Sequence, residues 1–273
     1  MISPTALSGC ARKLKMTRTE DYYAEPQHCY YAVRGSLLHG FLEVDLPGVI
    51  KERRIYKEVT FGPYAPWILS GRLDYYDTTT GFLLDFKTMS DKGTYVLFNQ
   101  GVKTEHVWQL NLYRWLLDGG HLDSPTGQQV HWPVNKMQIA HLFMNRVICS
   151  GERVTETFSQ SSSPNFGKTY KLEVPGSRKM IKGARYNKWQ IEFDIPDVPF
   201  KKTGQVEKYI EENTPERIRG FAEPSYVPEG VLHDPNKSWE CGFCPVQKQC
   251  KDYEKAIAVV NAMKNDGFAG VIF

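Results

Sequence analysis

Several short runs of the chain are rich in apolar and β-forming residues, and this pattern predicts β-strands. Three such runs occupy residues 56–61, 67–76 and 82–88 and are rich in β-branched and aromatic side chains. Turn-forming residues at 77–81 separate the second run from the third, so we predict that these two strands form a hairpin. Later runs predict further strands at residues 137–148, 154–158 and 190–195.

Other segments carry apolar residues at helical spacing. Ser3-Pro4 is typical of a helix start, because serine caps free backbone N–H groups and proline needs no hydrogen bond there. The spacing predicts a second helix over residues 33–44 and a late helix over residues 206–218.

A further helix is predicted directly after the hairpin region. Thr104 is its expected N-cap, residues 107–117 form its apolar body, and Gly119-Gly120 is its expected stop. Gln109 and Tyr113, four positions apart, would share one face of this helix.

The bulk composition is that of an ordinary globular protein and names no substrate. The 273 residues are 24% charged and 41% hydrophobic, enough to bury a real core. A net charge of +3 is too small to imply a nucleic-acid partner by itself. The sequence shows no secretory signal and no run long enough to span a membrane, so we expect a cytoplasmic protein without a membrane partner.

Asp74, Asp85 and Lys87 form the clearest candidate site. Asp85 and Lys87 lie two apart on a predicted strand and would project from one face, and the hairpin can bring Asp74 beside them. Two carboxylates can hold a divalent cation that neutralises a phosphate, while the cation and a lysine activate water for phosphodiester cleavage. The alternative is that these are surface acids near a turn and a solvated lysine.

Motifs before and after these residues favour the catalytic site over the surface alternative. A helix with Gly35 and His39 (G-x-x-x-H) comes before the strand with Gly71 and Asp74 (G-x-x-D); the D-x-K strand and a helix with Q-x-x-x-Y follow. In this order the chain resembles the RecB-like PD-(D/E)xK nucleases, and the resemblance extends from Ser3 to about Cys250.

The resemblance implies a fold and a set of residue roles. The fold would be α/β, a restriction-endonuclease-like core with a mixed central sheet flanked by helices, in a single nuclease domain over residues 1–273. A divalent metal, Mn²⁺ or Mg²⁺, would be held by His39, Asp74, Asp85 and the backbone carbonyl of Phe86. The implied catalytic residues are Asp74, Asp85, Lys87 as the catalytic lysine, and Gln109 and Tyr113, which would position substrate and lysine.

The implied function is that of a metal-dependent deoxyribonuclease. Many of the relatives it resembles are exonucleases on single-stranded DNA ends, acting in recombination, repair, replication or CRISPR adaptation, where a helicase, recombinase or integrase would be the protein partner. The alternative is a noncatalytic DNA-binding or adaptor protein that keeps the fold. The full set of site residues favours the enzyme, because a degenerate member would be expected to lose the acid or the lysine first.

The cysteines suggest a second metal centre. Cys241, Cys244 and Cys250 have the spacing C-x2-C-x5-C, which suits zinc or an iron–sulfur cluster. The segment around Cys10 resembles the N-terminal cysteine segment of the iron–sulfur branch of these nucleases, which includes the AddB nuclease domain and the CRISPR-associated adaptation nucleases. That resemblance implies a 4Fe-4S cluster on these four cysteines, in a subdomain made of residues 1–30 and 224–255. Cys29 and Cys149 are expected to be free thiols.

Residues 159–189 lose apolar periodicity and predict a basic insertion or flap. This segment has a single acidic residue, Glu173, against seven basic ones. One hypothesis is that Lys179, Lys182 and Arg185 contact the phosphates of a single strand, with neighbouring aromatic residues stacking on its bases. A solvated charged surface is the alternative.

Overall fold

The computed structural model describes the part of the chain that builds three sheets and the helices packed around them. The described residues are 1–22, 33, 35–37, 40, 46–89, 102–143, 154–157, 169–173, 190–191, 197–228, 230, 244–246 and 249–250.

The first sheet consists of four antiparallel strands. These are β2 (Arg54–Val59), β3 (Trp67–Arg72), β6 (Asp118–Leu122) and β7 (Gln129–His131). Their order in the sheet is β3-β2-β6-β7. We did not predict β6 and β7, which are both short. Strand β6 contains the two glycines of the expected helix stop, and backbone pairing to β2 and to β7 holds it in the sheet.

The second sheet is mixed and carries the predicted site. Its strands are β1 (Val49–Ile50), β4 (Tyr75–Asp77), β5 (Phe82–Met89) and β8 (Lys136–Phe143), in the order β1-β4-β5-β8. Strands β4 and β5 are antiparallel, which confirms the predicted hairpin, whereas β5 and β8 are parallel. The segment that follows β8 therefore begins at the edge of the sheet where β5 ends.

The prediction of one continuous strand over residues 67–76 is wrong. The structure divides this run at Leu73 and Asp74, with β3 in the first sheet and β4 in the second. Leu73 still donates a backbone hydrogen bond, at 2.9 Å, to Arg53, the residue immediately before β2 of the first sheet. The chain therefore crosses between the sheets immediately before Asp74.

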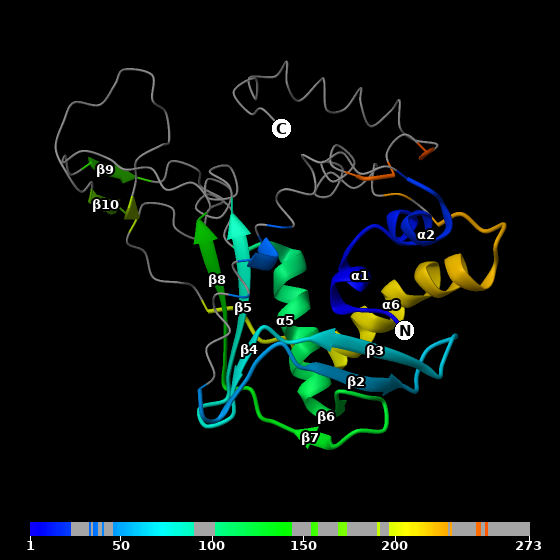
Figure 1. The fold of residues 1–273 in the computed structure, drawn as a ribbon, viewed down its shortest axis with the longest axis horizontal. Coiled ribbons are helices and arrows are strands. Elements are labelled where there is room, and N and C mark those ends of the chain that lie inside the picture. Colours follow the sequence, from blue (N-terminus) through cyan, green and yellow to red (C-terminus); the bar gives the residue numbers. More distant parts are fainter. Residues whose placement is uncertain are drawn as a thin grey trace, which may run out of the picture.

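The central helix α5 (Thr104–Leu117) joins the two sheets. Its buried leucines share one core with Ile55 and Leu69 of the first sheet and with Leu83 and Ile139 of the second. In Figure 1, α5 lies in the middle of the molecule, between the upright strands β5 and β8 and the remaining labelled helices. A side chain on α5 can therefore contact residues of either sheet. The N-cap is Lys103 rather than the predicted Thr104, which is the first residue of the helix.

The remaining helices are α1 (Pro4–Ser8), α2 (Ala11–Thr19) and α6 (Thr203–Ala222), which lie together on the far side of α5 (Figure 1). The side chain of Ser3 accepts a hydrogen bond from the Ala6 N–H at 3.2 Å, which confirms the predicted helix start. Helix α6 is longer at both ends than the predicted 206–218. No helix in the described part of the chain is both long and apolar enough to cross a membrane.

A third sheet lies between β8 and α6 in the sequence. It contains β9 (Val154–Thr157), β10 (Thr169–Glu173) and β11 (Gln190–Ile191) in the antiparallel order β11-β10-β9. The basic insertion predicted at 159–189 thus includes a strand that we did not predict. Within the predicted helix 33–44, residues 33, 35–37 and 40 are described, and they are helical.

Candidate active site

Asp74 and Asp85 stand side by side where the chain enters the second sheet. Tyr75 pairs with Leu84, so the register places Asp74 next to Asp85, one position further along. Oδ2 of Asp74 accepts a hydrogen bond from the Phe86 N–H at 2.8 Å. Strand β4 pairs through its backbone with residues 82–84 of β5, whereas the N–H of Phe86, further along β5, donates to the side chain of Asp74. The structure brings together the two acids that the sequence placed on neighbouring strands.

Asp85 and Lys87 project from the same face of β5, as their spacing of two predicts. The Lys87 ammonium lies 2.6 Å from Oδ2 of Asp85. Asp85 is only 1% exposed, while the side chain of Lys87 is 26% exposed. The carboxylate of Asp85 is therefore buried, while the ammonium of Lys87 beside it is accessible to solvent or to a phosphate.

Gln109 and Tyr113 of α5 complete a continuous hydrogen-bonded group. The Gln109 amide donates to Oδ1 of Asp85 at 3.0 Å and to the Tyr113 hydroxyl at 3.1 Å. Both residues are buried. A side-chain amide has two N–H donors, and Gln109 uses one on each partner. The helix residues predicted to share a face therefore hold one oxygen of Asp85 while Lys87 holds the other.

Tyr113 is kept protonated by its surroundings. Burial raises the pKa of Tyr113 above its ordinary value, and the negative charges of Asp85 and then Asp74 raise it further, although the hydrogen bond from Gln109 acts in the opposite direction. Tyr113 is therefore a neutral phenol throughout the physiological pH range and does not supply a negative charge of its own.

His39, the third predicted metal ligand, lies outside the described residues. Gly35, four positions earlier, is described, and a Cβ built on it would lie 3.7 Å from the Thr88 hydroxyl. Thr88 follows Lys87 in β5. The helix of the G-x-x-x-H motif therefore reaches the end of β5 that carries the predicted site. Sequence reasoning did not identify Thr88, and nothing in its local pattern distinguishes it.

The chemistry of the Asp74–Asp85 pair suits a hard divalent cation, which prefers carboxylate oxygens. Within the described ranges, no group of three His, Cys, Asp or Glu side chains could by itself hold a metal ion. The pair supplies two of the predicted ligands. The carbonyl of Phe86 and the side chain of His39 remain predictions.

Three of the four predicted cluster cysteines are described, and they come from both ends of the chain. Cys10 caps α2, and its sulfur accepts a hydrogen bond from the Lys13 N–H at 3.4 Å. Cys10, Cys244 and Cys250 are free thiols, and each is partly buried. The thiols of Cys10 and Cys250 both influence the pKa of Cys244 electrostatically, so the three lie in one neighbourhood. Cys241 lies outside the described residues.

Two cations of α2, the buried Arg12 and the partly buried Lys13, lie near these thiols. Arg12 is 5% exposed; it donates to the Pro228 carbonyl at 2.8 Å and to the sulfur of Cys250 at 3.7 Å. Burial raises the pKa of Cys244, and a backbone hydrogen bond from Val246 and then the positive charge of Lys13 offset this effect only in part. Such hydrogen bonds and positive charges favour the thiolate, the form that binds zinc or an iron–sulfur cluster, but at Cys244 burial outweighs them and the pKa is raised. Among the described residues, Cys10, Cys244 and Cys250 do not by themselves form a group that could hold a metal ion, so the cluster stays a prediction.

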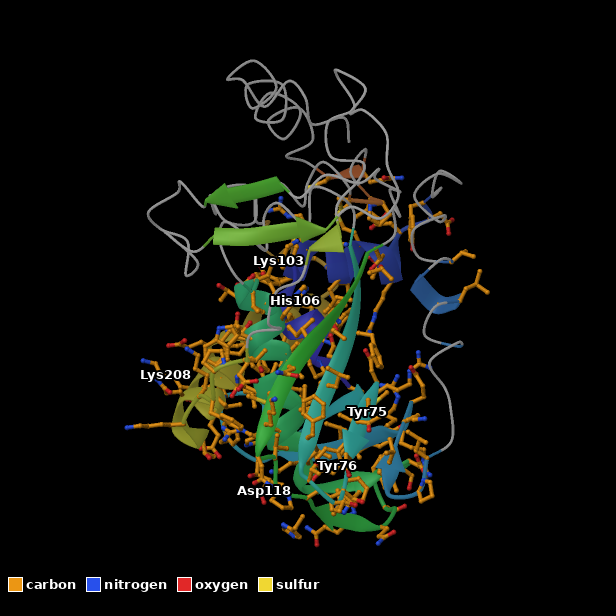
Figure 2. The ribbon with its side chains drawn as sticks, turned by 90° about the vertical axis from the view of Figure 1, so that its left-hand side faces the viewer. Tyr75, Tyr76, Lys103, His106, Asp118 and Lys208 are labelled. Atoms are coloured by element: carbon orange, nitrogen blue, oxygen red, sulfur yellow. The ribbon has the colours of Figure 1, made fainter. Side chains whose placement is uncertain are left out.

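The third sheet lies at the end of the second sheet that carries the predicted site. Figure 2 shows β9 and β10 at the same end of the molecule as Lys103 and His106, which mark the beginning of α5, whereas Asp118 lies at the opposite end. The chain returns from this sheet to β8, where Gln138 pairs with Asp197. Lys179, Lys182 and Arg185 lie outside the described residues, so their contact with DNA remains a prediction.

Comparison with known proteins gives a match to a protein family and matches to solved structures. A sequence model of the PD-(D/E)XK nuclease superfamily matches residues 42–251, which include all the described site residues except Cys10. The fold is similar to that of the crystal structure of SSO0001, with a TM-score of 0.51 and 16% sequence identity, covering 92% of this chain and 86% of that one. No curated protein matches the chain.

Proposed function

The chain belongs to the PD-(D/E)XK nuclease superfamily, and we propose that it is a divalent-metal-dependent deoxyribonuclease that degrades DNA from single-stranded ends. The observation that carries this proposal is the environment of Asp85. One oxygen of this buried carboxylate is held by Gln109, the other lies against Lys87, and Asp74 stands beside it. A purely structural role would not require two carboxylates and a partly exposed lysine next to one another.

The residues around the phosphodiester would have different roles. Asp74 and Asp85, with His39 and the Phe86 carbonyl, would hold the cation, which when bound supplies positive charge to the phosphate and acidifies a water molecule. Lys87, partly exposed beside Asp85, would orient the attacking water and stabilise the charge that develops on the phosphate. Gln109 and the neutral Tyr113 would fix the carboxylate of Asp85 and keep its oxygens in place.

The preference for single-stranded ends rests on the insertion after β8. Because β8 runs parallel to β5, this insertion leaves the second sheet at the edge where Lys87 lies. A basic segment at that place could hold a flexible strand through its phosphates. The noncatalytic alternative would require this surface without cleavage, and the complete set of acids, lysine and glutamine argues against it.

Digestion of end-labelled DNA tests the proposed function. With Mn²⁺ present, we expect single-stranded DNA to be shortened from its ends at least about tenfold faster than blunt duplex DNA, because only an unpaired strand can follow a narrow basic path to the site. The products of 5′- and 3′-labelled strands should be compared on a sequencing gel, with a circular single strand as the control. No cleavage of any DNA would refute nuclease function, and equal cleavage of circular and linear strands would refute action from ends.

A second prediction concerns the insertion itself. Replacing Lys179, Lys182 and Arg185 with glutamate should weaken binding of single-stranded DNA and flatten its salt dependence. If each residue contacts one phosphate, the slope of log affinity against log salt should fall by about 2. The measurement is fluorescence anisotropy of a labelled oligonucleotide at several salt concentrations. Replacing exposed Lys208 of α6 with glutamate is the matched control. Equal slopes in the wild type and the triple variant would assign these charges to a solvated surface.

We further propose that Cys10, Cys241, Cys244 and Cys250 bind a 4Fe-4S cluster that joins the two ends of the chain. Support comes from the three described thiols in one neighbourhood and from the hydrogen bonds that Lys13 and Arg12 donate to their sulfurs. The role would be structural, because a link between residue 10 and residue 250 closes a very long loop. Residues 1–30 and 224–255 would then form a cluster subdomain of the single nuclease domain.

A further inference from the structure

Gly71 lies in the interior of β3 and faces the ring of Tyr113. A Cβ built on Gly71 would stand 2.4 Å from Cε1 and 2.8 Å from Cδ1 of that ring. Real Cβ atoms do not approach other atoms so closely. The next neighbour, a methyl group of Leu116 at 3.2 Å, is the end of a flexible side chain and could move. The constraint on position 71 is therefore the ring of Tyr113.

The backbone does not explain the glycine. Among the described residues, four glycines adopt the left-handed conformation that other residues avoid, namely Gly48, Gly62, Gly81 and Gly119, and Gly71 is not one of them. Gly71 pairs with Ile55 in a regular antiparallel register. A glycine in the interior of a strand weakens it, and such a residue often marks a close approach of another group. At Gly71 that group is an aromatic ring from α5.

Tyr113 connects this approach to the predicted catalytic group. Its hydroxyl lies 3.1 Å from the Gln109 amide, which also donates to Asp85 at 3.0 Å. We propose that Gly71 is a positioning residue for the reaction: its missing side chain lets Tyr113 lie against β3, and Tyr113 in turn holds Gln109 against Asp85. This inference rests on the proposed nuclease function. It assigns the glycine of the G-x-x-D motif to Tyr113 rather than to Asp74, three residues later.

The expected displacement is large compared with these hydrogen bonds. Ordinary contact with a Cβ begins at 3.4 Å, so a methyl group at position 71 must push the ring edge away by about 1 Å from its present 2.4 Å. Moving Tyr113 that far would break or lengthen its bond to Gln109 and free the amide to turn away from Asp85. A misplacement of about 1 Å in a catalytic group can reduce the rate about 100-fold.

Gly71→Ala tests the inference by kinetics. We expect kcat on single-stranded DNA to fall about 10- to 100-fold and KM to change less than about threefold, because the DNA path is untouched. Gly204→Ala in α6 is the matched control: its Cβ would meet nothing within 4 Å, so kcat should remain that of the wild type. If the wild type is active and Gly71→Ala keeps full kcat, the inference is wrong. An inactive wild type would instead refute the proposed function.

A double-mutant cycle on stability separates steric contact with Tyr113 from a general defect of β3. Gly71→Ala alone should lower the urea midpoint of unfolding by at least about 0.5 M. Added to Tyr113→Ala, which removes the ring, the same substitution should lower it by less than half as much. If Gly71→Ala alone does not fold, the double variant should still be as soluble as Tyr113→Ala. Equal losses in both backgrounds, or an insoluble double variant, would overturn the inference.

Discussion

Replacing Asp85 with asparagine should reduce DNA cleavage about 1000-fold or more while leaving the fold intact. Asparagine has the shape of aspartate and can still accept the hydrogen bond from Gln109 through Oδ1. It loses the negative charge that pairs with Lys87 and that would bind the cation. Since the proposed reaction depends on that cation, the rate should fall to the level of the wild type in a chelator. Initial rates on end-labelled DNA, with circular dichroism to monitor the fold, provide the measurement.

Asp77→Asn is the matched control for this prediction. Asp77 lies at the other end of the same hairpin, where its oxygens accept hydrogen bonds from Thr79 and Thr80. Asparagine can make the backbone bond of this turn, so cleavage should stay within about twofold of the wild type. If Asp85→Asn kept more than a tenth of the wild-type rate and that activity resisted chelation, the proposed site would not be responsible for cleavage.

Much of this site could be predicted because it depends on local geometry. Asp85 and Lys87 share a face of β5 since side chains of a strand alternate, and Gln109 and Tyr113 share a face of α5 since they lie four apart. The structure brings these pairs together through one hydrogen bond, from Gln109 to Asp85. The sequence motifs predicted the order of the elements. The contact between Gln109 and Asp85 depends on the position of α5 between the two sheets.

The crossing between the sheets could not be predicted in the same way. Residues 67–76 begin and end with β-forming residues, and the Gly71 and Asp74 between them do not form the dense turn cluster that separates the strands of the hairpin. The division comes from pairing, since β3 finds its partner in β2 and β4 finds its partner in β5. Strand pairing is a tertiary property, and it can override the local pattern. Gly71 did carry a usable signal, because an isolated glycine inside a strand suggests a close approach.

Buried charges were also outside the reach of the local pattern. Arg12, Lys15 and Arg217 are each less than a tenth exposed, although such residues are usually found at the surface. Each donates to backbone carbonyl groups more than 200 positions away in the sequence. These bonds tie α1 and α2 to α6 and to the segment after it. A cation whose hydrogen-bond partners come from the other end of the chain cannot be placed from its neighbours in sequence.

Replacing Cys250 with serine should remove most of the iron from the anaerobically purified protein. The wild type is expected to be brown and to contain about four iron and four sulfide per chain. Cys250 lies beside Arg12, near Cys244 and Cys10, and serine oxygen is a poor substitute for a thiolate that soft metals prefer. We expect the variant to keep less than about a fifth of the iron, measured by colorimetric iron and sulfide assays with visible spectra.

The loss should also weaken the association of the chain ends. Because metal binding to the folded state stabilises it, the thermal midpoint of the Cys250→Ser protein should fall by several degrees, about 5 °C or more. Cys149→Ser is the control, since Cys149 has no partner at ligand spacing and its replacement should leave iron content and midpoint unchanged. Zinc in place of iron in the wild type, or full iron in Cys250→Ser, would contradict the cluster. Zinc in the wild type would still be compatible with a link made by the four cysteines, because tetrahedral zinc uses the same ligands. Full iron in Cys250→Ser would contradict that link as well.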